Sequence, residues 1–246
     1  MRTMLMAALV LAAGASPGRA VEVTNANAEI LRYSASITGL PLGRLTVKTA
    51  RDATSYGAKV KFKMTSLVRL FIDTDAKAKV AGRLAGGAMI PERFEYWVRD
   101  EDDEQETALV FTAAGDPGSV TATPPFRRKK YAMDIADAAG AVDPATAAAM
   151  LTAPRAAACT LAMRVFDGRK LHGVSLTPSP DAASPGTVRC EGLYERLGGF
   201  KRKYMTPDRR TYPFTAELKQ VAADRWIPMR IWAITKFGPA SAVLEE

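Results

Sequence analysis

A short pattern that occurs twice constrains the fold of this chain more than any other feature. Residues 87–99 and residues 224–235 each place a polar or glycine turn before Ile-Pro-x-Arg and a run rich in aromatic and β-branched residues. Proline donates no ladder hydrogen bond but is tolerated as the first residue of a strand, so Pro91 and Pro228 are predicted to begin strands. Two such units favour one strand-rich sheet with a repeated hairpin plan, and two copies leave coincidence open as an alternative.

The clearest strand lies at residues 58–64, Ala-Lys-Val-Lys-Phe-Lys-Met. Its apolar residues point one way and its lysines the other, which is the period of two of a strand with one solvated face. Residues 66–72 fit either a short helix or a buried strand. Further strands are expected at residues 30–37, 44–51, 76–80, 94–98, 108–112, 119–123, 159–166, 170–177, 188–193, 212–221 and 229–234.

One helix stands out in this β pattern. Asp143 is a good N-cap, Pro144 suits the first helical position, and Pro154 ends the alanine-rich run that follows. The fold class predicted is therefore mainly β, with one or two short helices packed on the sheet.

The first twenty residues have the parts of a secretory signal peptide: Arg2 near the start, a short apolar run, and a small-residue exit at Gly18-Arg19-Ala20. Cleavage is expected after Ala20, which leaves residues 21–246 as a single β-rich domain in the periplasm. No later stretch approaches the roughly 20 apolar residues that a membrane-spanning helix needs.

The chain is basic, with a formal charge of +8 that becomes +6 once Arg2 and Arg19 are removed (8 − 2). This excess does not indicate a nucleic-acid partner. In an envelope compartment the functional interpretation of the basic clusters is contact with anionic polymers or head groups. The preferred interpretation is a solvated loop, because charge runs are usually solvated faces. The clusters are Arg127, Arg128, Lys129 and Lys130, and Lys201, Arg202 and Lys203 with Arg209 and Arg210.

Catalytic and cofactor motifs are missing from the mature sequence. His172 is the only histidine, which argues against histidine metal clusters and leaves one candidate for a hydrolase triad. The only Gly-x-Ser-x-Gly match, residues 14–18, lies in the signal, and there is no phosphate loop or dinucleotide fingerprint. The acidic run at residues 99–104 lacks the glycine of a calcium loop and is expected to be a solvated turn. We expect no catalytic residue, no cofactor and no metal.

Two cysteines in an exported chain predict a disulfide between Cys159 and Cys190. Oxidising compartments keep such pairs bonded, and both residues lie on or near predicted strands.

The order of these features resembles an uncharacterised family of exported proteobacterial proteins that carries a domain of unknown function. The resemblance implies a curved antiparallel sheet, similar to the half-barrel of the outer-membrane lipoprotein carriers, and implies no catalytic residues. The features that carry it are Tyr33, Gly39 and Gly43, then Gly87, Pro91 and Phe94, the Asp143 helix, the turn at residues 166–169, Cys190, and Pro228 with Gly238.

The function expected is binding or carrying of an acyl or lipid-like ligand, with a non-catalytic protein that docks to envelope polymers or to another envelope protein as the alternative. A curled sheet leaves either a filled core or an apolar cavity, and the same aromatic residues serve both. The ligand-binding candidates are Phe94, Tyr96, Trp97 and Trp232.

Overall fold

The computed structural model describes residues 21–65, 74–100, 103–127 and 129–245, and β-strands dominate it. The predicted signal peptide and residues 66–72 lie outside the described residues. The helical segments are η1 (Ile135–Ala138), α2 (Pro144–Met150), η2 (Arg202–Tyr204) and α3 (Pro207–Arg210). The strands are β1 (Glu29–Ile37), β2 (Leu40–Arg51), β3 (Ser55–Met64), β4 (Thr74–Ala85), β5 (Ala88–Asp100), β6 (Asp103–Phe111), β7 (Pro117–Thr123), β8 (Ala141–Val142), β9 (Leu161–Phe166), β10 (Leu171–Pro178), β11 (Thr187–Gly198), β12 (Thr211–Ala222), β13 (Arg225–Thr235) and β14 (Gly238–Leu244).

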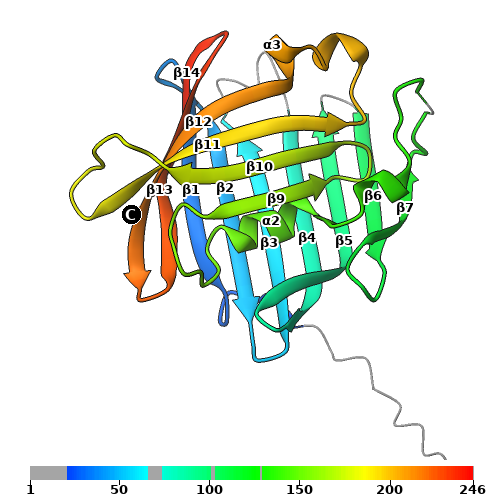
Figure 1. Cartoon of the computed structure of the whole chain (residues 1–246). Coiled ribbons are helices and arrows are strands. Elements are labelled where there is room, and N and C mark those ends of the chain that lie inside the picture. Colours follow the sequence, from blue (N-terminus) through cyan, green and yellow to red (C-terminus); the bar gives the residue numbers. More distant parts are fainter. Residues whose placement is uncertain (1–20, 66–73, 101–102, 128, 246) are drawn as a thin grey trace, which may run out of the picture.

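All fourteen strands form one sheet, in the spatial order β7-β6-β5-β4-β3-β2-β1-β14-β13-β12-β11-β10-β9-β8. The first and last strands meet in its middle, where β1 pairs with β14, and each half of the chain forms a meander from there to one edge. Among the described strands, only the two-residue β8 pairs in parallel, with β9. The sheet rolls up so that β9–β12 lie across from β2–β6 with α2 between them (Figure 1). The predicted curved, barrel-like antiparallel sheet is confirmed.

The two Ile-Pro-x-Arg units are β-bulges. Pro91 and Pro228 are each the fourth residue of their strand, so the prediction that they begin strands is wrong. The residue after each proline, Glu92 in β5 and Met229 in β13, is the extra residue at a register shift. A bulge interrupts the ladder of hydrogen bonds locally. The N–H that proline lacks therefore leaves no unpaired carbonyl in the regular part of the ladder.

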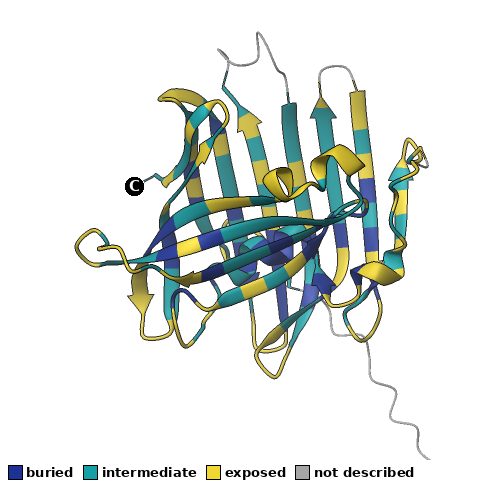
Figure 2. Cartoon of the chain, turned by 45° about the horizontal axis from the view of Figure 1, so that its top comes forward, coloured by how far each residue is buried: buried dark blue, intermediate teal, exposed yellow. Residues whose placement is uncertain are grey.

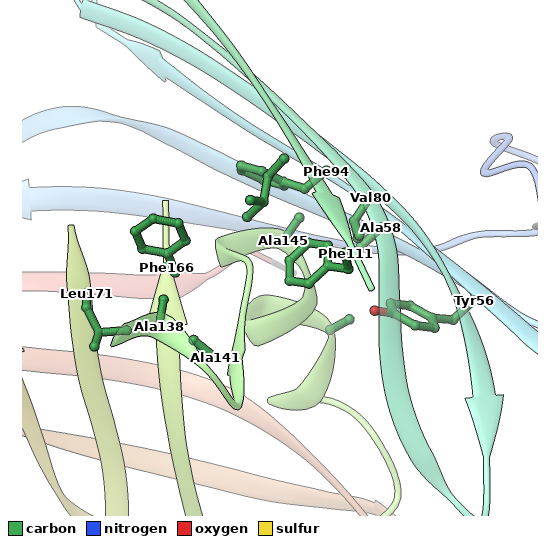
Figure 3. Close-up of a cluster of buried hydrophobic side chains, with 12 residues drawn as sticks. Tyr56, Ala58, Val80, Phe94, Phe111, Ala138, Ala141, Ala145, Phe166 and Leu171 are labelled. Atoms are coloured by element: carbon green, nitrogen blue, oxygen red, sulfur yellow. The ribbon is translucent and has the colours of Figure 1, made fainter. Parts of the chain in front are cut away.

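Helix α2 fills one part of the rolled sheet. The side chain of Asp143 accepts hydrogen bonds from the backbone N–H groups of Ala145 and Thr146, both at 2.9 Å, and Pro144 occupies the first turn, as predicted. The buried face of α2 is small, with Ala145 and Ala149 at 0% and 1% exposure, so β3–β5 and β9 approach it closely from opposite sides (Figure 3).

The main core surrounds this helix. Figure 2 shows the buried residues gathered on the strand segments near α2. The cluster consists of Tyr56, Ala58, Val80, Phe94, Leu109, Phe111, Ala138, Ala141, Ala145, Ala149, Phe166 and Leu171.

A buried hydrogen-bond chain ties the helix cap to β3. The Tyr56 hydroxyl lies 2.7 Å from Oγ1 of Thr146, which in turn donates to Oδ2 of Asp143 at 2.5 Å. Burial disfavours the charged carboxylate and raises the pKa of Asp143 to about 6, although the hydrogen bonds from Thr146 and Ala145 act against this shift.

A second core lies where the segment that follows α2 packs on β10, β11 and β12. It contains the predicted disulfide, which is confirmed: Cys159 and Cys190 are bonded, with a Cα–Cα distance of 5.4 Å. The bond joins the segment before β9 to β11. The buried members of this cluster are Ala158, Cys159, Leu176, Cys190, Ala216 and Leu218.

We predict that replacing both cysteines by alanine lowers the free energy of unfolding by about 3–4 kcal/mol. The bond closes a loop between residues separated by 31 positions, and its removal restores that loop's freedom in the unfolded chain. Urea unfolding of the oxidised protein and of the double variant measures the difference. An equal midpoint and slope for the two proteins would contradict the prediction.

We predict that the stability difference between the protein and its Asp143→Asn variant depends on pH. The pKa of Asp143 is about 6 when folded, above its ordinary value, so the folded state binds this proton more tightly than the unfolded state. Asparagine keeps a capping side chain but cannot titrate. Relative to the variant, the protein should gain up to about 3 kcal/mol as the pH falls from about 7.5 to about 4. Urea titrations of both proteins at several pH values test this, and a constant difference would contradict it.

Candidate functional site

The candidate site is a hollow of about 550 Å³ where the two edges of the rolled sheet approach each other, which we call the seam hollow. One wall is the edge strand β7, another is the β9–β10 turn, and the chain that crosses between the halves forms the third. Phe166 of its lining belongs to the main core, and Val120, Met133 and Ile135 pack against that core. The hollow therefore reaches the core from outside. The apolar residues are Val120, Ala122, Phe126, Met133, Ile135 and Phe166.

The crossing segment is fixed to both edges by hydrogen bonds. The N–H of Gly140 donates to Asp116 beside β7 at 2.6 Å, and Arg164 of β9 donates to the carbonyls of Asp137 and Ala139. The side chain of Gln105 in β6 also donates to the Pro124 carbonyl at 2.8 Å. The segment therefore spans the gap that strand pairing leaves open.

The β9–β10 turn reaches across and touches the opposite edge. Asp167 accepts from the backbone N–H groups of Arg169 and Lys170, at 2.8 and 2.7 Å, which closes the turn. Gly168 has φ +94°, and a Cβ placed there would lie 2.8 Å from Cγ2 of Thr107 and 3.3 Å from Cγ1 of Val120. Glycine is required here both by the backbone and by the close contact.

Basic side chains form the rim of the seam hollow. Arg127 and Lys129 of the first predicted cluster line it, together with Arg169, whose guanidinium lies 4.7 Å from the centre of the Phe126 ring. Lys130 is exposed and does not line the hollow. Arg128 lies outside the described residues.

The second predicted cluster is on a short exposed connection between β11 and β12. Lys201, Arg202 and Lys203 are exposed at η2, and Lys203 lies 5.0 Å from the Tyr204 ring. Arg209 and Arg210 are exposed at the end of α3. These positions suit surface contact and a solvated loop equally, so the predicted anionic contact there stays a prediction.

His172 belongs to a polar chain beside the turn. Its Nδ1 lies 2.6 Å from the Tyr194 hydroxyl, and its Nε2 lies 3.6 Å from Oδ2 of Asp167. Burial favours the protonated carboxyl of Asp167, but His172 and the N–H groups of the turn outweigh it, so the pKa of Asp167 is lowered. Burial raises the pKa of Tyr194. The arrangement orients the imidazole between a carboxylate and a phenol. Sequence analysis singled out His172 alone, because its partners come from a turn and from another strand.

The four aromatic ligand-binding candidates do not share one site. Phe94 is 0% exposed in the main core, with Tyr96 stacked beside it at a ring distance of 6.3 Å. Trp97 points to the opposite face of β5, where the Lys77 ammonium lies 4.4 Å from its ring centre. Trp232 lies in the other half of the sheet under Arg230, at 4.8 Å. The period of two along a strand separates neighbours such as Tyr96 and Trp97.

Comparison with known proteins places the chain in a family. A family model described as a protein of unknown function, DUF3108, matches residues 32–245. The chain belongs to this family. The predicted membership of an uncharacterised family is thus confirmed.

Among solved structures, a β-barrel-like protein of the domain of unknown function DUF1849 from Brucella abortus is similar to this DUF3108 member at 11% sequence identity and a TM-score of 0.46. That match covers 89% of this chain and 96% of the other. No curated protein matches the chain. Within the described residues, no helix has the length and apolar character needed to cross a membrane.

We predict that Gly168→Ala costs more stability than Gly39→Ala. Both glycines have a positive φ, +94° and +82°, but nothing lies within 4 Å of a Cβ at Gly39, whereas the methyl group at position 168 meets Thr107. The Gly39 variant should lose about 1–2 kcal/mol of unfolding free energy from backbone strain. The Gly168 variant should lose about 1 kcal/mol more, because its methyl group also meets a side chain. Urea unfolding of the two variants measures the difference, and equal losses would show that the turn does not close the seam.

Proposed function

We propose that this protein is a non-catalytic binding or carrier protein for an amphiphile with an apolar chain and an anionic head group, held in the seam hollow. The observation that supports it is the meeting of an apolar lining with a basic rim at the outer edge of β7, which none of the described strands covers. The expected export to the periplasm, between two lipid membranes, belongs to the same proposal.

The apolar part of the ligand would lie against the edge of the main core. Phe126, Met133 and Ile135 are only partly buried there, so they leave apolar surface accessible to water at a place that is concave. Each methylene that leaves water contributes about 0.8 kcal/mol, so an alkyl chain of moderate length gains enough to bind without many specific contacts.

The head group would meet Arg127, Lys129 and Arg169. A guanidinium and an ammonium suit a carboxylate or a phosphate, because charge-assisted hydrogen bonds are stronger than neutral ones. Arg169 is already placed by its contact with the Phe126 ring, which reduces the freedom it loses when a ligand binds.

The proposal is tested with purified protein and two probes of equal chain length, dodecanoate and dodecanol. We expect one dodecanoate per chain, bound about ten-fold more tightly than dodecanol, since only the carboxylate interacts with the basic rim. Isothermal titration gives the affinities, and native mass spectrometry gives the stoichiometry and any adduct that survives gentle isolation.

Two variants assign the binding to the seam hollow. Arg127→Gln with Lys129→Gln should weaken dodecanoate binding and leave dodecanol binding unchanged, whereas Ala122→Phe should weaken both by filling the hollow. The matched control, Lys201→Gln with Lys203→Gln, removes the same charge from an exposed turn. Absence of binding by both probes, or an equal effect of the rim and control variants, would overturn the proposal.

A further inference from the structure

A second concave surface lies on the outward face of the sheet, opposite α2. It is a hollow of about 750 Å³ over β1–β7, which we call the lysine groove. Seven basic side chains and two acidic ones line it, so it concentrates a formal charge of +5 (7 − 2) in a chain whose total is +8. The basic residues are Arg32, Lys48, Lys59, Lys61, Lys77, Lys79 and Arg93, and the acidic ones are Glu95 and Glu106.

The strand register places lysines directly opposite one another. Lys59 of β3 pairs with both Lys48 of β2 and Lys79 of β4, and Lys61 pairs with Lys77. Like charges in directly opposed positions of an antiparallel pair destabilise a sheet. Lysines also protect exposed sheet edges, but β3 and β4 lie inside the strand order and have no edge to protect.

Internal partners neutralise little of this charge. Lys79 lies 2.7 Å from Glu95, which Arg93 also contacts at 2.9 Å, and these two hydrogen bonds lower the pKa of Glu95. Lys59 donates to the uncharged Val23 carbonyl. Within the described part of the chain the ammonium group of Lys61 has no hydrogen bond or ion pair. The groove therefore retains an unbalanced field that an anionic ligand would neutralise.

The other lining residues show which kind of anion fits. Thr46, Thr121 and Thr123 present hydroxyl groups, which donate and accept hydrogen bonds. Lysine and alanine are depleted in protein–protein interfaces, and the lining of this groove contains five lysines and Ala108. A planar membrane surface does not enter a concave groove. Thr46 lies between Arg32 and Lys61 in the register, whereas the other two threonines lie on β7 at the far end of the groove. A hydroxyl beside basic groups matches a chain of sugars that carries acidic groups.

The spacing of the ammonium groups suits repeated negative charges. Neighbouring strands are about 4.8 Å apart, and alternate residues of one strand are roughly 7 Å apart, so the five lysines of β2–β4 form a small lattice across three strands. We propose that the lysine groove binds an acidic polysaccharide, with its carboxylate or phosphate groups on Lys61, Lys77 and their neighbours. This site is independent of the seam hollow, because the two open on different faces of the sheet.

The test uses oligogalacturonate as the acidic glycan, with a neutral maltodextrin, poly-glutamate and oligothymidylate of similar length as comparisons. Quenching of Trp97 fluorescence in a Trp226→Phe, Trp232→Phe background reports binding, because Trp97 lines the groove. We expect oligogalacturonate to bind, with an affinity that falls steeply as salt is added, and the neutral glycan not to bind. Tighter binding of poly-glutamate or of oligothymidylate would overturn the proposal in favour of a protein or nucleic-acid partner.

The variant Lys61→Gln with Lys77→Gln identifies the surface. It should lower the affinity for oligogalacturonate about ten-fold or more, whereas the control Lys201→Gln with Lys203→Gln, with the same loss of charge, should change it less than about two-fold. The groove variant should also melt at a higher temperature at low salt, because it removes a like-charge pair. A raised melting temperature with unchanged affinity would place glycan binding elsewhere and refute the proposal.

Discussion

The fold depends on how α2 fills the space between the two halves of one rolled sheet. Two β-layers that face each other across a helix need a helix with small side chains, and α2 provides alanines on its buried side. Its N-terminal end is fixed by Asp143, whose carboxyl is buried completely and joined through Thr146 to Tyr56 in β3. An unpaired carboxyl at this depth would carry a large desolvation cost, so the cap and the tyrosine hold the helix at one position against the sheet. The position of α2 in turn places the segment that crosses between the two halves of the sheet, and with it the seam hollow.

The local part of this architecture could be predicted from the sequence, and the long-range part could not. Alternation at residues 58–64 and the Asp143-Pro144 pair determine a strand and a helix through neighbouring residues alone. The pairing of β1 with β14 joins residues about 200 positions apart, and nothing in either strand's own pattern selects the other. The prolines of the repeated units illustrate the same limit, since a proline at a strand start and a proline at a bulge both lack a ladder hydrogen bond, and only the partner strand's register distinguishes them.

The candidate sites were incompletely predicted for a related reason. The seam hollow draws on β7, the crossing segment and the β9–β10 turn, which come together only when the sheet closes. Sequence analysis recognised Arg127 and Lys129 as part of a basic cluster but had no means of placing Arg169 beside them. The lysines of β3 were recognised as a solvated face, and residues 76–80 of β4 were recognised only as a strand; both descriptions are correct for each strand alone. The cross-strand register turns two solvated stripes into opposed like-charge pairs.

The way the sheet closes bears on which wall of the seam hollow can open. In a fully paired barrel, separating two strands breaks a row of ladder hydrogen bonds, whereas β7 meets the opposite edge here through side chains and the turn at Gly168. Opening this contact exposes Thr107 and Val120 but breaks no hydrogen bond between the strands that the structure describes. The hydrogen bonds of Arg164 and Gly140 hold the crossing segment on the other side of the hollow, so the wall formed by the turn is the one that separates at lower cost. Under the proposed carrier function, a chain-like ligand would reach the apolar interior from this edge while the rest of the sheet stays paired.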